Sequence, residues 1–300
     1  MNDLFNRFSE CGEVKEDVSF TTLTTYKAGG TARFVVYPRN VFSLQSIISI
    51  CKENGLPFKV FGNGSNILCS DDVFEGVIIR LNRTMNQFSY DGNVLTARAG
   101  CSIISLAYES ARNSLSGLEF ASGIPGSLGG CLFMNAGAYK SSMSDVITEV
   151  QVLIDDQIVW LSNRQCEFGY RTSVFQKHPE WIILAARIQL VPADRDTITN
   201  LMKTRQQRRF ETQPLEMPSA GSVFRNPEGD FAWKYIDMIG YRGHCIGDAC
   251  VSEKHSNFIV NKGHATGSEI AELIEEIQKK VKEQFGIELV LEVEKFNWTK

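Results

Sequence analysis

The sequence lacks several patterns that would assign it to familiar classes of protein. No apolar stretch among its 300 residues approaches the length needed to cross a bilayer. It contains neither a G-x-x-x-x-G-K-[ST] loop nor a G-x-G-x-x-G fingerprint, which argues against P-loop and standard Rossmann nucleotide sites. The first residues include Asp3, Arg7 and Glu10 and no apolar segment of a secretory signal. We therefore expect a cytoplasmic protein without membrane insertion.

Cysteine is present, but not in the patterns of a disulfide framework or a metal site. None of the eight cysteines forms a C-x-x-C pair, and no zinc-ligand spacing occurs. They are Cys11, Cys51, Cys69, Cys101, Cys131, Cys166, Cys245 and Cys250. In a chain without an export signal, buried free thiols are expected in preference to disulfides. We expect no metal site.

The composition is that of an ordinary globular protein. Hydrophobic residues make up 43% and charged residues 22% of the chain, and 300 residues suffice for two or three packed units. A net charge of −4 argues against a dedicated nucleic-acid surface. The short basic run from Arg205 to Arg209 fits a solvated helix face better than a site for a substrate phosphate.

The segment from Gly62 to Leu68 is a glycine-rich turn after an apolar strand at 58–61. Glycine permits positive φ and a close approach of the backbone to a ligand. Successive backbone N–H groups in such a turn form a concavity that binds anions, and Asn63, Ser65 and Asn66 add side-chain donors. The local pattern indicates a pyrophosphate cradle, although an ordinary surface loop has the same composition.

A second glycine-rich segment runs from Gly117 to Tyr139. Ordering such a chain is entropically costly, so we expect a flat, extended ligand to lie against it. Its glycines include Gly123, Gly126, Gly129, Gly130 and Gly137, and Pro125 fixes one φ angle.

Hydrophobic periodicity and turn residues predict an α+β protein. The best-specified element is a helix that begins at the capping box Thr266 to Glu269, carries one apolar stripe and ends at Gly286. Other helices are expected at 41–54, 102–113 with Ser102 as N-cap, 197–210 and 232–239. Strands are expected at 58–61, 77–81, 94–99, 149–154, 158–161, 181–190, 222–225, 257–260 and 287–296, with a hairpin turn at 155–157. Boundaries near Val73 and Pro192 would separate the packed units.

Six motifs occur in order and together resemble one family. They are Thr25 to Gly30 (TYKAGG), Gly62 to Asn66 (GNGSN), Ser122 to Gly130 (SGIPGSLGG), Asn135 to Tyr139 (NAGAY), Gly169 to Arg171 (GYR) and Ala220 to Phe224 (AGSVF). In this combination the chain resembles, over nearly its whole length, the UDP-N-acetylenolpyruvoylglucosamine reductases of bacterial peptidoglycan precursor synthesis.

The resemblance implies a non-Rossmann flavin fold of the vanillyl-alcohol-oxidase type. Two FAD-binding subdomains would span 1–73 and 74–192, and a substrate-binding domain would span 193–300, with the final strand 287–296 returning to the active site. The residues implied to hold FAD are Gly62, Asn63, Gly64, Ser65, Asn66, Ile67, Leu68, Gly100, Ser122, Gly123, Ile124, Pro125, Gly126, Ser127, Gly129, Gly130 and Gly137.

Many related oxidases attach FAD through a histidine. The histidines of this chain all lie outside 62–137, so we expect non-covalent FAD. They are His178, His244, His255 and His264.

The implied reaction reduces UDP-N-acetylglucosamine enolpyruvate to UDP-N-acetylmuramate. NADPH reduces FAD and leaves, and hydride then passes from flavin N5 to C3 of the enolpyruvyl group, so that negative charge develops on C2 and its carboxylate. One form of the family carries a tyrosine-loop insertion between the arginine and serine motifs. Here Arg171 is followed directly by strand, helix and Ser222, so the chain resembles the shorter second type.

Three residues match the roles that this chemistry requires. Arg171 would bind the carboxylate, because a guanidinium can grip it in a bidentate way. Ser222 would donate the proton to C2, and a carboxyl group on the final strand would be the hydrogen-bonding partner opposite the substrate carboxylate. The family's usual Glu-Val-Arg ending is replaced by Glu292-Val293-Glu294. Spacing favours Glu292, but strand alternation would put Glu294 on the same face, so both stay open.

Substrate contacts are expected from Arg225, Asn226 and Lys262, with His255 and Asn257 as further candidates. Two other functions compete with a monomeric reductase. A flavin oxidase of the same fold would use oxygen and would need no site for proton delivery. A non-catalytic nucleotide-binding regulator is favoured only by the altered ending at Glu294 and Lys295.

Overall fold

The structure, a computed structural model, describes residues 2–298 and contains two compact units. The first unit comprises Met1–Glu16, Phe34–Asn63 and Glu75–Gln207. The second comprises Asp17–Arg33, Gly64–Phe74 and Arg208–Lys300. The three-part division with boundaries near Val73 and Pro192 stays a prediction. Among residues 2–298, no helix is both long enough and apolar enough to span a membrane.

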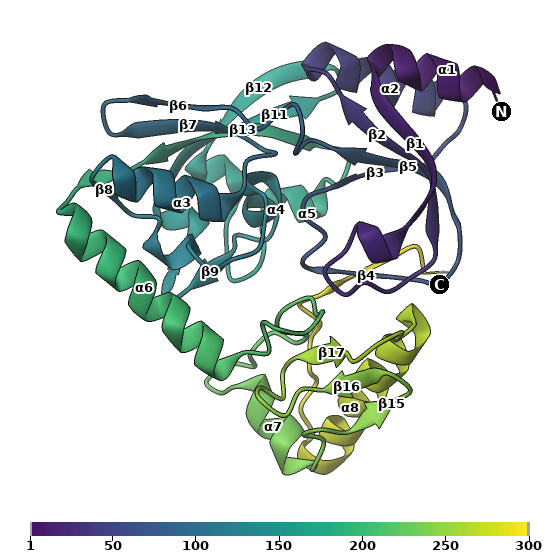
Figure 1. The fold of residues 1–300 in the computed structure, drawn as a ribbon, viewed down its shortest axis with the longest axis vertical. Coiled ribbons are helices and arrows are strands. Elements are labelled where there is room, and N and C mark those ends of the chain that lie inside the picture. Colours follow the sequence, from purple (N-terminus) through teal and green to yellow (C-terminus); the bar gives the residue numbers. More distant parts are fainter. Residues whose placement is uncertain (1, 299–300) are drawn as a thin grey trace. The chain divides into compact units, whose positions relative to one another are not determined.

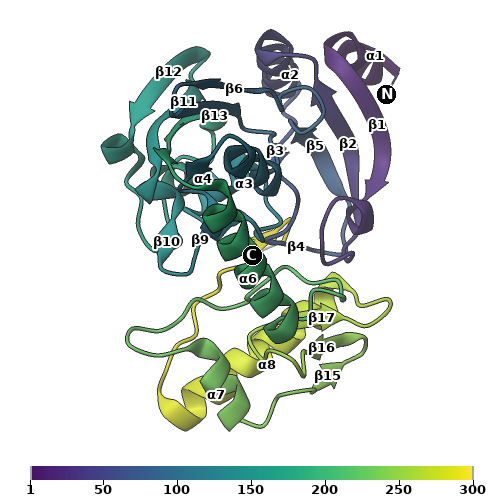
Figure 2. The ribbon, with the colours of Figure 1, turned by 60° about the vertical axis from the view of Figure 1, so that its left-hand side comes forward.

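A four-stranded sheet forms one half of the first unit, apart from strand ends at 17–19, 31–33 and 74, which belong to the second unit. Its strand order is β1 (Gly12–Ser19), β2 (Thr31–Pro38), β5 (Phe74–Arg80) and β3 (Phe58–Phe61), and β3 runs parallel to β5. Helices α1 (Asn2–Cys11) and α2 (Val41–Glu53) lie together beside it (Figure 2). The α2 helix confirms its sequence signal, because its regularly spaced apolar residues are buried and Asn40 caps its first turn.

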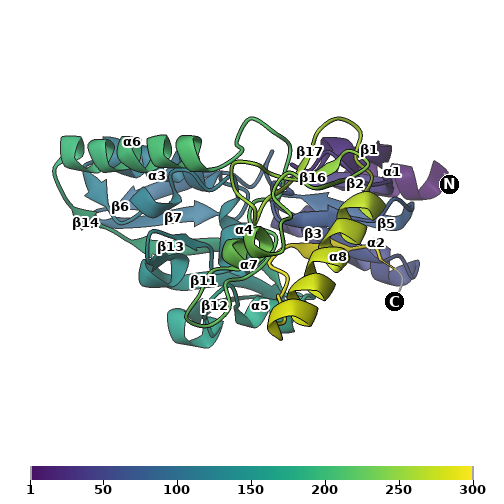
Figure 3. The ribbon, with the colours of Figure 1, turned by 90° about the horizontal axis from the view of Figure 1, so that it is seen from below.

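A five-stranded antiparallel sheet forms the other half. Its order is β12 (Gln157–Ser162), β11 (Ile147–Ile154), β13 (Ile182–Gln189), β7 (Val94–Arg98) and β6 (Phe88–Asp91). Helix α3 (Ile103–Arg112) lies along one face of this sheet (Figure 3). The expected hairpin is confirmed, and both turn residues, Asp155 and Asp156, have positive φ, which matches the twist of the strands.

Short elements complete this part of the chain. They are β8 (Leu115–Ser116), α4 (Leu128–Phe133), β9 (Gly137–Ala138), β10 (Ser141–Ser142), α5 (Val174–Lys177), β14 (Val191–Pro192) and the 3-10 turns Glu119–Ala121, Met143–Asp145 and Asn163–Cys166. The linking helix α6 (Arg195–Thr212) follows β14, and the run from Arg205 to Arg209 lies within it as expected.

The second unit packs one long helix against a small sheet. Helix α8 (Gly267–Phe285) covers the sheet β15 (Cys245–Ile246), β16 (Ala249–Val251) and β17 (Ile259–Asn261), with α7 (Ala232–Met238) beside it (Figure 1). The unit also holds the 3-10 turn Phe20–Thr22 and the parallel pair β4 (Ile67–Cys69) and β18 (Glu294–Phe296). The capping box of α8 and the left-handed Gly286 that ends it are both confirmed.

Two strand predictions are corrected. The final strand is limited to Glu294–Phe296, so Glu292 lies outside it and strand alternation cannot relate the two glutamates. The segment 222–225 forms no strand and contributes only an isolated bridge between Phe224 and Leu291. In both places the backbone hydrogen bonds go to several short, separate segments and not to one continuous partner strand.

The expectation that all cysteines are free is also wrong. Cys245 and Cys250 form a disulfide, whereas the other six cysteines are free and buried. The β15–β16 hairpin places these two residues directly opposite one another, with Cα atoms 4.1 Å apart. Directly opposed positions of an antiparallel pair bring side chains close enough for a disulfide, which spacing alone did not suggest.

Candidate active site

The glycine turn begins in the first unit, where Gly62 follows β3. A Cβ on Gly62 would lie only 2.5 Å from the Ser127 hydroxyl oxygen, so a side chain there would have to displace that serine. Ser127 in turn caps α4 by accepting a hydrogen bond from the Gly130 N–H at 3.3 Å. The Asn63 amide donates to the Pro125 carbonyl at 3.3 Å. The two glycine-rich segments of the sequence therefore meet here within one unit.

A cavity of about 310 Å³ opens beside this meeting point. It is lined by Asn63, Asn82, Asn86, Phe88, Gly100, Cys101, Ser102, Ser105 and Leu106. The Asn82 Oδ1 atom is buried and has no hydrogen-bond partner among residues 2–298. A buried acceptor without a partner is costly, and Asn82 is one of the residues that line the cavity. The amide and hydroxyl groups of the lining, with the apolar Phe88 and Leu106, suit the nucleotide half of FAD.

Several glycines of the second segment are explained by packing within the protein. A Cβ on Gly126 would lie 2.8 Å from the Cys131 sulfur, and one on Gly129 would lie 3.1 Å from the Ala99 Cβ. A Cβ on Gly100 would overlap the Leu81 carbonyl oxygen. These glycines allow backbone segments to approach one another. Direct contact of the segment with a flavin stays a prediction.

Arg171 lies at the tip of a tight turn in the first unit. Gly169 and Thr172 pair across this turn through backbone hydrogen bonds of 3.0 and 3.3 Å. The φ of Arg171 is +54°, a left-handed value that costs a residue with a Cβ about 1–2 kcal/mol. Its guanidinium donates to the Gly137 carbonyl at 2.9 Å, and the Gln176 amide donates to its carbonyl at 3.0 Å. Strain held in place by such bonds is typical of functional positions.

The rest of the glycine turn belongs to the second unit. Gly64 has a φ of +66°, and a Cβ there would overlap the Leu23 carbonyl oxygen. Thr25 secures the turn, because its N–H donates to the Gly64 carbonyl at 3.0 Å and its hydroxyl donates to the Ser219 carbonyl at 2.6 Å. The Thr25-Tyr26-Lys27 motif thus connects the glycine turn to the chain just before Ser222.

The structure brings Ser222 and Glu292 into the same part of the second unit. Ser222 follows Gly221, whose φ is +76°, and its hydroxyl has no hydrogen-bond partner among residues 2–298. The Glu292 N–H donates to the Val223 carbonyl at 2.8 Å. The Asn66 amide donates to the Glu292 carbonyl at 3.0 Å. The main chain of Glu292 is therefore fixed next to the serine segment on one side and the glycine turn on the other.

Glu294 occupies a different environment from Glu292. It pairs with Ile67 in the two-stranded β4–β18 sheet. Burial, and to a lesser extent the Glu294 carboxylate, raise the pKa of the Cys69 thiol, so this carboxylate lies near that cysteine. Of the two glutamates, Glu292 therefore lies next to the segment that carries Ser222, whereas Glu294 lies in the β4–β18 pair.

The three candidate substrate ligands differ in their surroundings. The Arg225 Nε atom is buried and has no partner among residues 2–298, so its N–H is left to donate to an anionic oxygen. Asn226 is exposed, and its Oδ1 accepts from the Ala232 N–H at 3.2 Å at the start of α7. The Lys262 ammonium lies 3.9 Å from the Cys245 sulfur. The roles of these residues as substrate ligands stay predictions.

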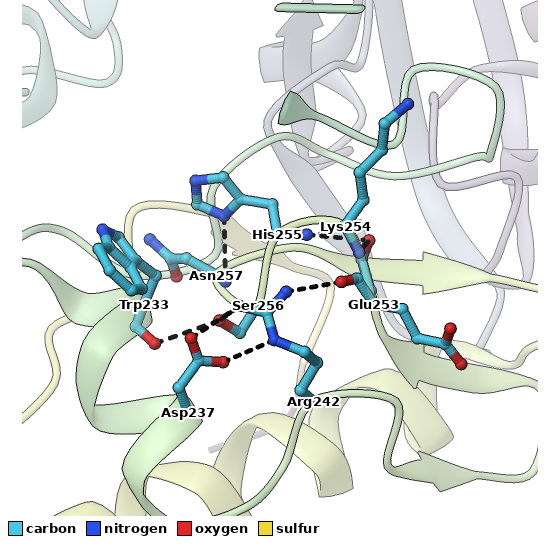
Figure 4. A network of polar contacts seen from close by, with 9 residues as sticks. Trp233, Asp237, Arg242, Glu253, Lys254, His255, Ser256 and Asn257 are labelled. Atoms are coloured by element: carbon cyan, nitrogen blue, oxygen red, sulfur yellow. Dashed lines mark hydrogen bonds and ion pairs between the residues drawn. The ribbon is translucent and has the colours of Figure 1, made fainter. Parts of the chain in front are cut away.

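His255 and Asn257 belong to a polar network (Figure 4). Arg242 grips Asp237 through hydrogen bonds of 3.0 and 2.7 Å and donates to the Glu253 carbonyl at 2.6 Å. Burial alone would raise the pKa of Asp237, but hydrogen bonds from Arg242 and Ser256 hold it below its ordinary value. Burial and the nearby Arg242 lower the pKa of His255, so this imidazole is neutral at pH 7.

Sequence reasoning missed Asn82 and gave Asn257 a different role. Asn82 lies in a loop after β5 and follows no motif, so nothing local distinguished it. The Asn257 side chain hydrogen-bonds to the main chain of Phe224, which is known only once the two segments are placed together. No group of three His, Cys, Asp or Glu side chains that could hold a metal ion occurs among residues 2–298.

Comparison with known proteins assigns both parts of the chain. A family model described as "FAD binding domain" matches residues 32–162. A second, described as "UDP-N-acetylenolpyruvoylglucosamine reductase, C-terminal domain", matches residues 213–296. These matches identify an FAD-dependent oxidoreductase, and the expected α+β class is confirmed.

Full-length relatives specify the family. Reductases of this name from Bacillus velezensis and from Clostridium botulinum (strain Eklund 17B / Type B) are each 42% identical; they cover 96% and 97% of this chain and 95% of their own. The chain belongs to the UDP-N-acetylenolpyruvoylglucosamine reductase family. A crystal structure of the Thermus caldophilus reductase superimposes with a TM-score of 0.81 at 33% identity and covers 95% of this chain and 99% of its own.

Proposed function

We propose that this protein reduces UDP-N-acetylglucosamine enolpyruvate to UDP-N-acetylmuramate with NADPH as hydride donor, as a cytoplasmic, monomeric enzyme with non-covalent FAD. The observation that carries the proposal is a Ser222 hydroxyl without a hydrogen-bond partner among residues 2–298, next to Val223, whose carbonyl accepts from the Glu292 N–H. An enzyme that protonates carbon needs a positioned donor of this kind, whereas an oxidase that passes electrons to oxygen does not.

FAD, when bound, supplies the hydride that reaches C3 of the substrate. The glycine turn, Asn82 and the cavity beside Gly100 are the groups that would hold its nucleotide half. Arg171 binds the substrate carboxylate, where negative charge develops, and its strained turn fixes the guanidinium before the substrate arrives. Preorganised charge of this kind stabilises a transition state without reorganisation during the reaction.

Ser222 donates its proton to C2 of the substrate. A serine is a weak acid, so the receiving carbon must be strongly basic and the transient alkoxide must be stabilised by its neighbours. Glu292 is the hydrogen-bonding partner opposite the substrate carboxylate, and a main-chain hydrogen bond to Val223 holds it in place. Arg225, whose buried Nε lacks a partner, binds a phosphate oxygen of the UDP group, with Asn226 and Lys262 as further contacts.

Anaerobic flavin spectroscopy on the purified holoenzyme tests this function. NADPH should bleach the flavin absorbance, and the UDP-linked enolpyruvyl sugar should restore it in one turnover. Release of the flavin on denaturation should leave none attached to the chain. Restoration only by air would identify an oxidase, and failure of NADPH to bleach the flavin would refute the proposed hydride donor.

A further inference from the structure

Ser222 sits at an irregularity between two chain segments of the second unit. Ser219 pairs with Val260, and the Asn261 N–H donates to the Pro218 carbonyl at 2.9 Å, as in an antiparallel ladder. Further along, the Val223 N–H donates to the Asn257 carbonyl at 2.8 Å. Three residues therefore separate 219 from 223, whereas only two separate 257 from 260. The segment that carries Ser222 therefore has one residue more than the segment opposite it, which is the count that defines a β-bulge.

The extra residue changes the direction of the Ser222 side chain. Gly221 adopts the left-handed conformation, with a φ of +76°, and apart from its chain neighbours no heavy atom of residues 2–298 lies within 4 Å of the place where its Cβ would be. In a bulge of this type a glycine takes the left-handed position and the following side chain is redirected. Such a bulge keeps its form only if the ladder resumes beyond it, so whatever holds Val223 and Phe224 fixes the direction of Ser222.

Beyond the bulge, the Asn257 side chain supplies the next hydrogen bonds to the main chain of the serine segment. Its Oδ1 accepts from the Phe224 N–H at 3.0 Å, and its Nδ2 donates to the Phe224 carbonyl at 2.8 Å. The amide thus takes the place of a strand neighbour, because β17 begins only at Ile259. The side chain is 3% exposed, so water cannot replace it. Both hydrogen-bonding ends of the amide are used, which leaves no reason to treat Asn257 as a substrate ligand.

The loop that carries Asn257 is itself held rigidly. The Ser256 hydroxyl donates to the Trp233 carbonyl at 3.1 Å, and Arg242 contacts Ser256 while it grips Asp237 (Figure 4). The Asn257 N–H donates to the His255 Nδ1 at 3.2 Å. A rigid support of this kind is what a precisely directed proton donor needs.

We infer that Asn257 is a positioning residue for proton delivery: its amide fixes the Gly221–Ser222 bulge and thereby directs the Ser222 hydroxyl at the substrate carbon. This inference rests on the proposed function, because it assumes that Ser222 donates the proton. It assigns to Asn257 a role in the second half-reaction alone, since reduction of the flavin by NADPH needs no proton from Ser222.

Two variants of the holoenzyme test the inference by anaerobic stopped-flow. Asn257→Ala should slow reoxidation of the reduced flavin by the UDP-linked enolpyruvyl sugar about 10²-fold, because a small misplacement of a reacting group has effects of that size. Flavin reduction by NADPH should stay within about twofold of the unmodified enzyme. Asn257→Asp should recover reoxidation as pH falls, because a protonated carboxyl, like the amide, can accept from Phe224 N–H and donate to its carbonyl.

Asn261→Ala is the matched control. Asn261 is also 3% exposed and also serves main-chain groups, donating to the Tyr26 carbonyl at 3.0 Å, so its removal tests for a loss due only to destabilisation. It should slow both half-reactions alike. The inference is overturned if Asn257→Ala reoxidises at the unmodified rate, if both of its half-reactions fall together, or if Asn261→Ala shows the same selective loss.

The inference can still be tested if Asn257→Ala does not fold. In that case the pH profile of Asn257→Asp decides, and an absence of recovery at low pH overturns the inference. Failure of the proposed function is recognised separately, because the unmodified enzyme would then not be reoxidised by the UDP-linked enolpyruvyl sugar at all.

Discussion

Replacement of Glu292 by Gln separates the two carboxylates that the sequence left open. The Glu292 N–H bonds to the Val223 carbonyl at 2.8 Å, and the Glu292 carbonyl accepts from the Asn66 amide at 3.0 Å. Neither bond involves the side chain, so Glu292→Gln keeps the main chain in place while it removes the charge. The free energy of unfolding should change by about 1 kcal/mol or less, because glutamine keeps the shape of the side chain and both main-chain bonds.

The catalytic effect should be much larger than the effect on stability. Groups that act on a proton or on developing charge in the transition state contribute on the order of 10²–10⁴-fold. Glu292→Gln should therefore lower kcat by about 10³-fold, which corresponds to about 4 kcal/mol of transition-state stabilisation. Bleaching of the flavin by NADPH should be nearly unchanged, because that step does not involve the enolpyruvyl group.

Glu294→Gln is the matched comparison. Glu294 is half-buried like Glu292, but it pairs with Ile67 and its carboxylate lies near the Cys69 thiol. It should retain kcat within about threefold, as expected for a substitution away from the reacting atoms. Steady-state turnover and the two half-reactions should be measured for both variants. Normal turnover of Glu292→Gln with a severe loss in Glu294→Gln would refute the assignment and move the role to Glu294.

Three further predictions concern stability. Gly64→Ala should destabilise the protein by more than about 2 kcal/mol, because the new Cβ would overlap the Leu23 carbonyl. Gly92 has a similar positive φ but open space around it, so Gly92→Ala should cost only about 1 kcal/mol. Urea unfolding should show this difference, and equal midpoints for the two variants would contradict it. Asp71→Ala should lower the free energy of unfolding by about 2 kcal/mol, because Asp71 accepts hydrogen bonds of 2.7 and 2.8 Å from the first N–H groups of α8 and one from a serine hydroxyl at 2.6 Å. Asp72→Ala should leave the free energy of unfolding nearly unchanged, and an equal loss in both variants would argue against capping by Asp71. The pKa of His255 is lowered in the folded protein, so below the ordinary value of about 6.5 the unfolded chain binds a proton that the folded chain does not, and the free energy of unfolding should fall as pH drops from 7 towards 5. The fall should be shallower in His255→Gln, and parallel curves for the two proteins would exclude this histidine as the cause.

Features that depend on residues within a few positions of one another could be predicted from the sequence. The capping box and apolar stripe of α8, the Ser102 cap of α3 and the Asp155-Asp156 hairpin all appear where the pattern placed them. Each is decided by hydrogen bonds or packing within one or two turns of chain, so neighbouring residues carry the whole signal. The motif order also led to the right family.

Features that depend on register between distant segments could not be predicted. The contrast between Glu292 and Glu294 follows from which residues meet Val223 and Ile67, and the two-residue period of a strand does not extend through Val293. The cap of α8 by Asp71 joins segments far apart in the sequence.

By itself, the sequence determined the family, the flavin and the helices and hairpins that local chemistry specifies. Only the tertiary structure decided that Cys245 faces Cys250, that Asn82 lines a cavity with an unpartnered acceptor, and that the Asn257 amide completes the ladder beside Ser222. The physical reason is that hydrogen-bond partners in these places are chosen by the packing of separate segments, and a buried polar group reveals its function only when its partner, or the lack of one, is known.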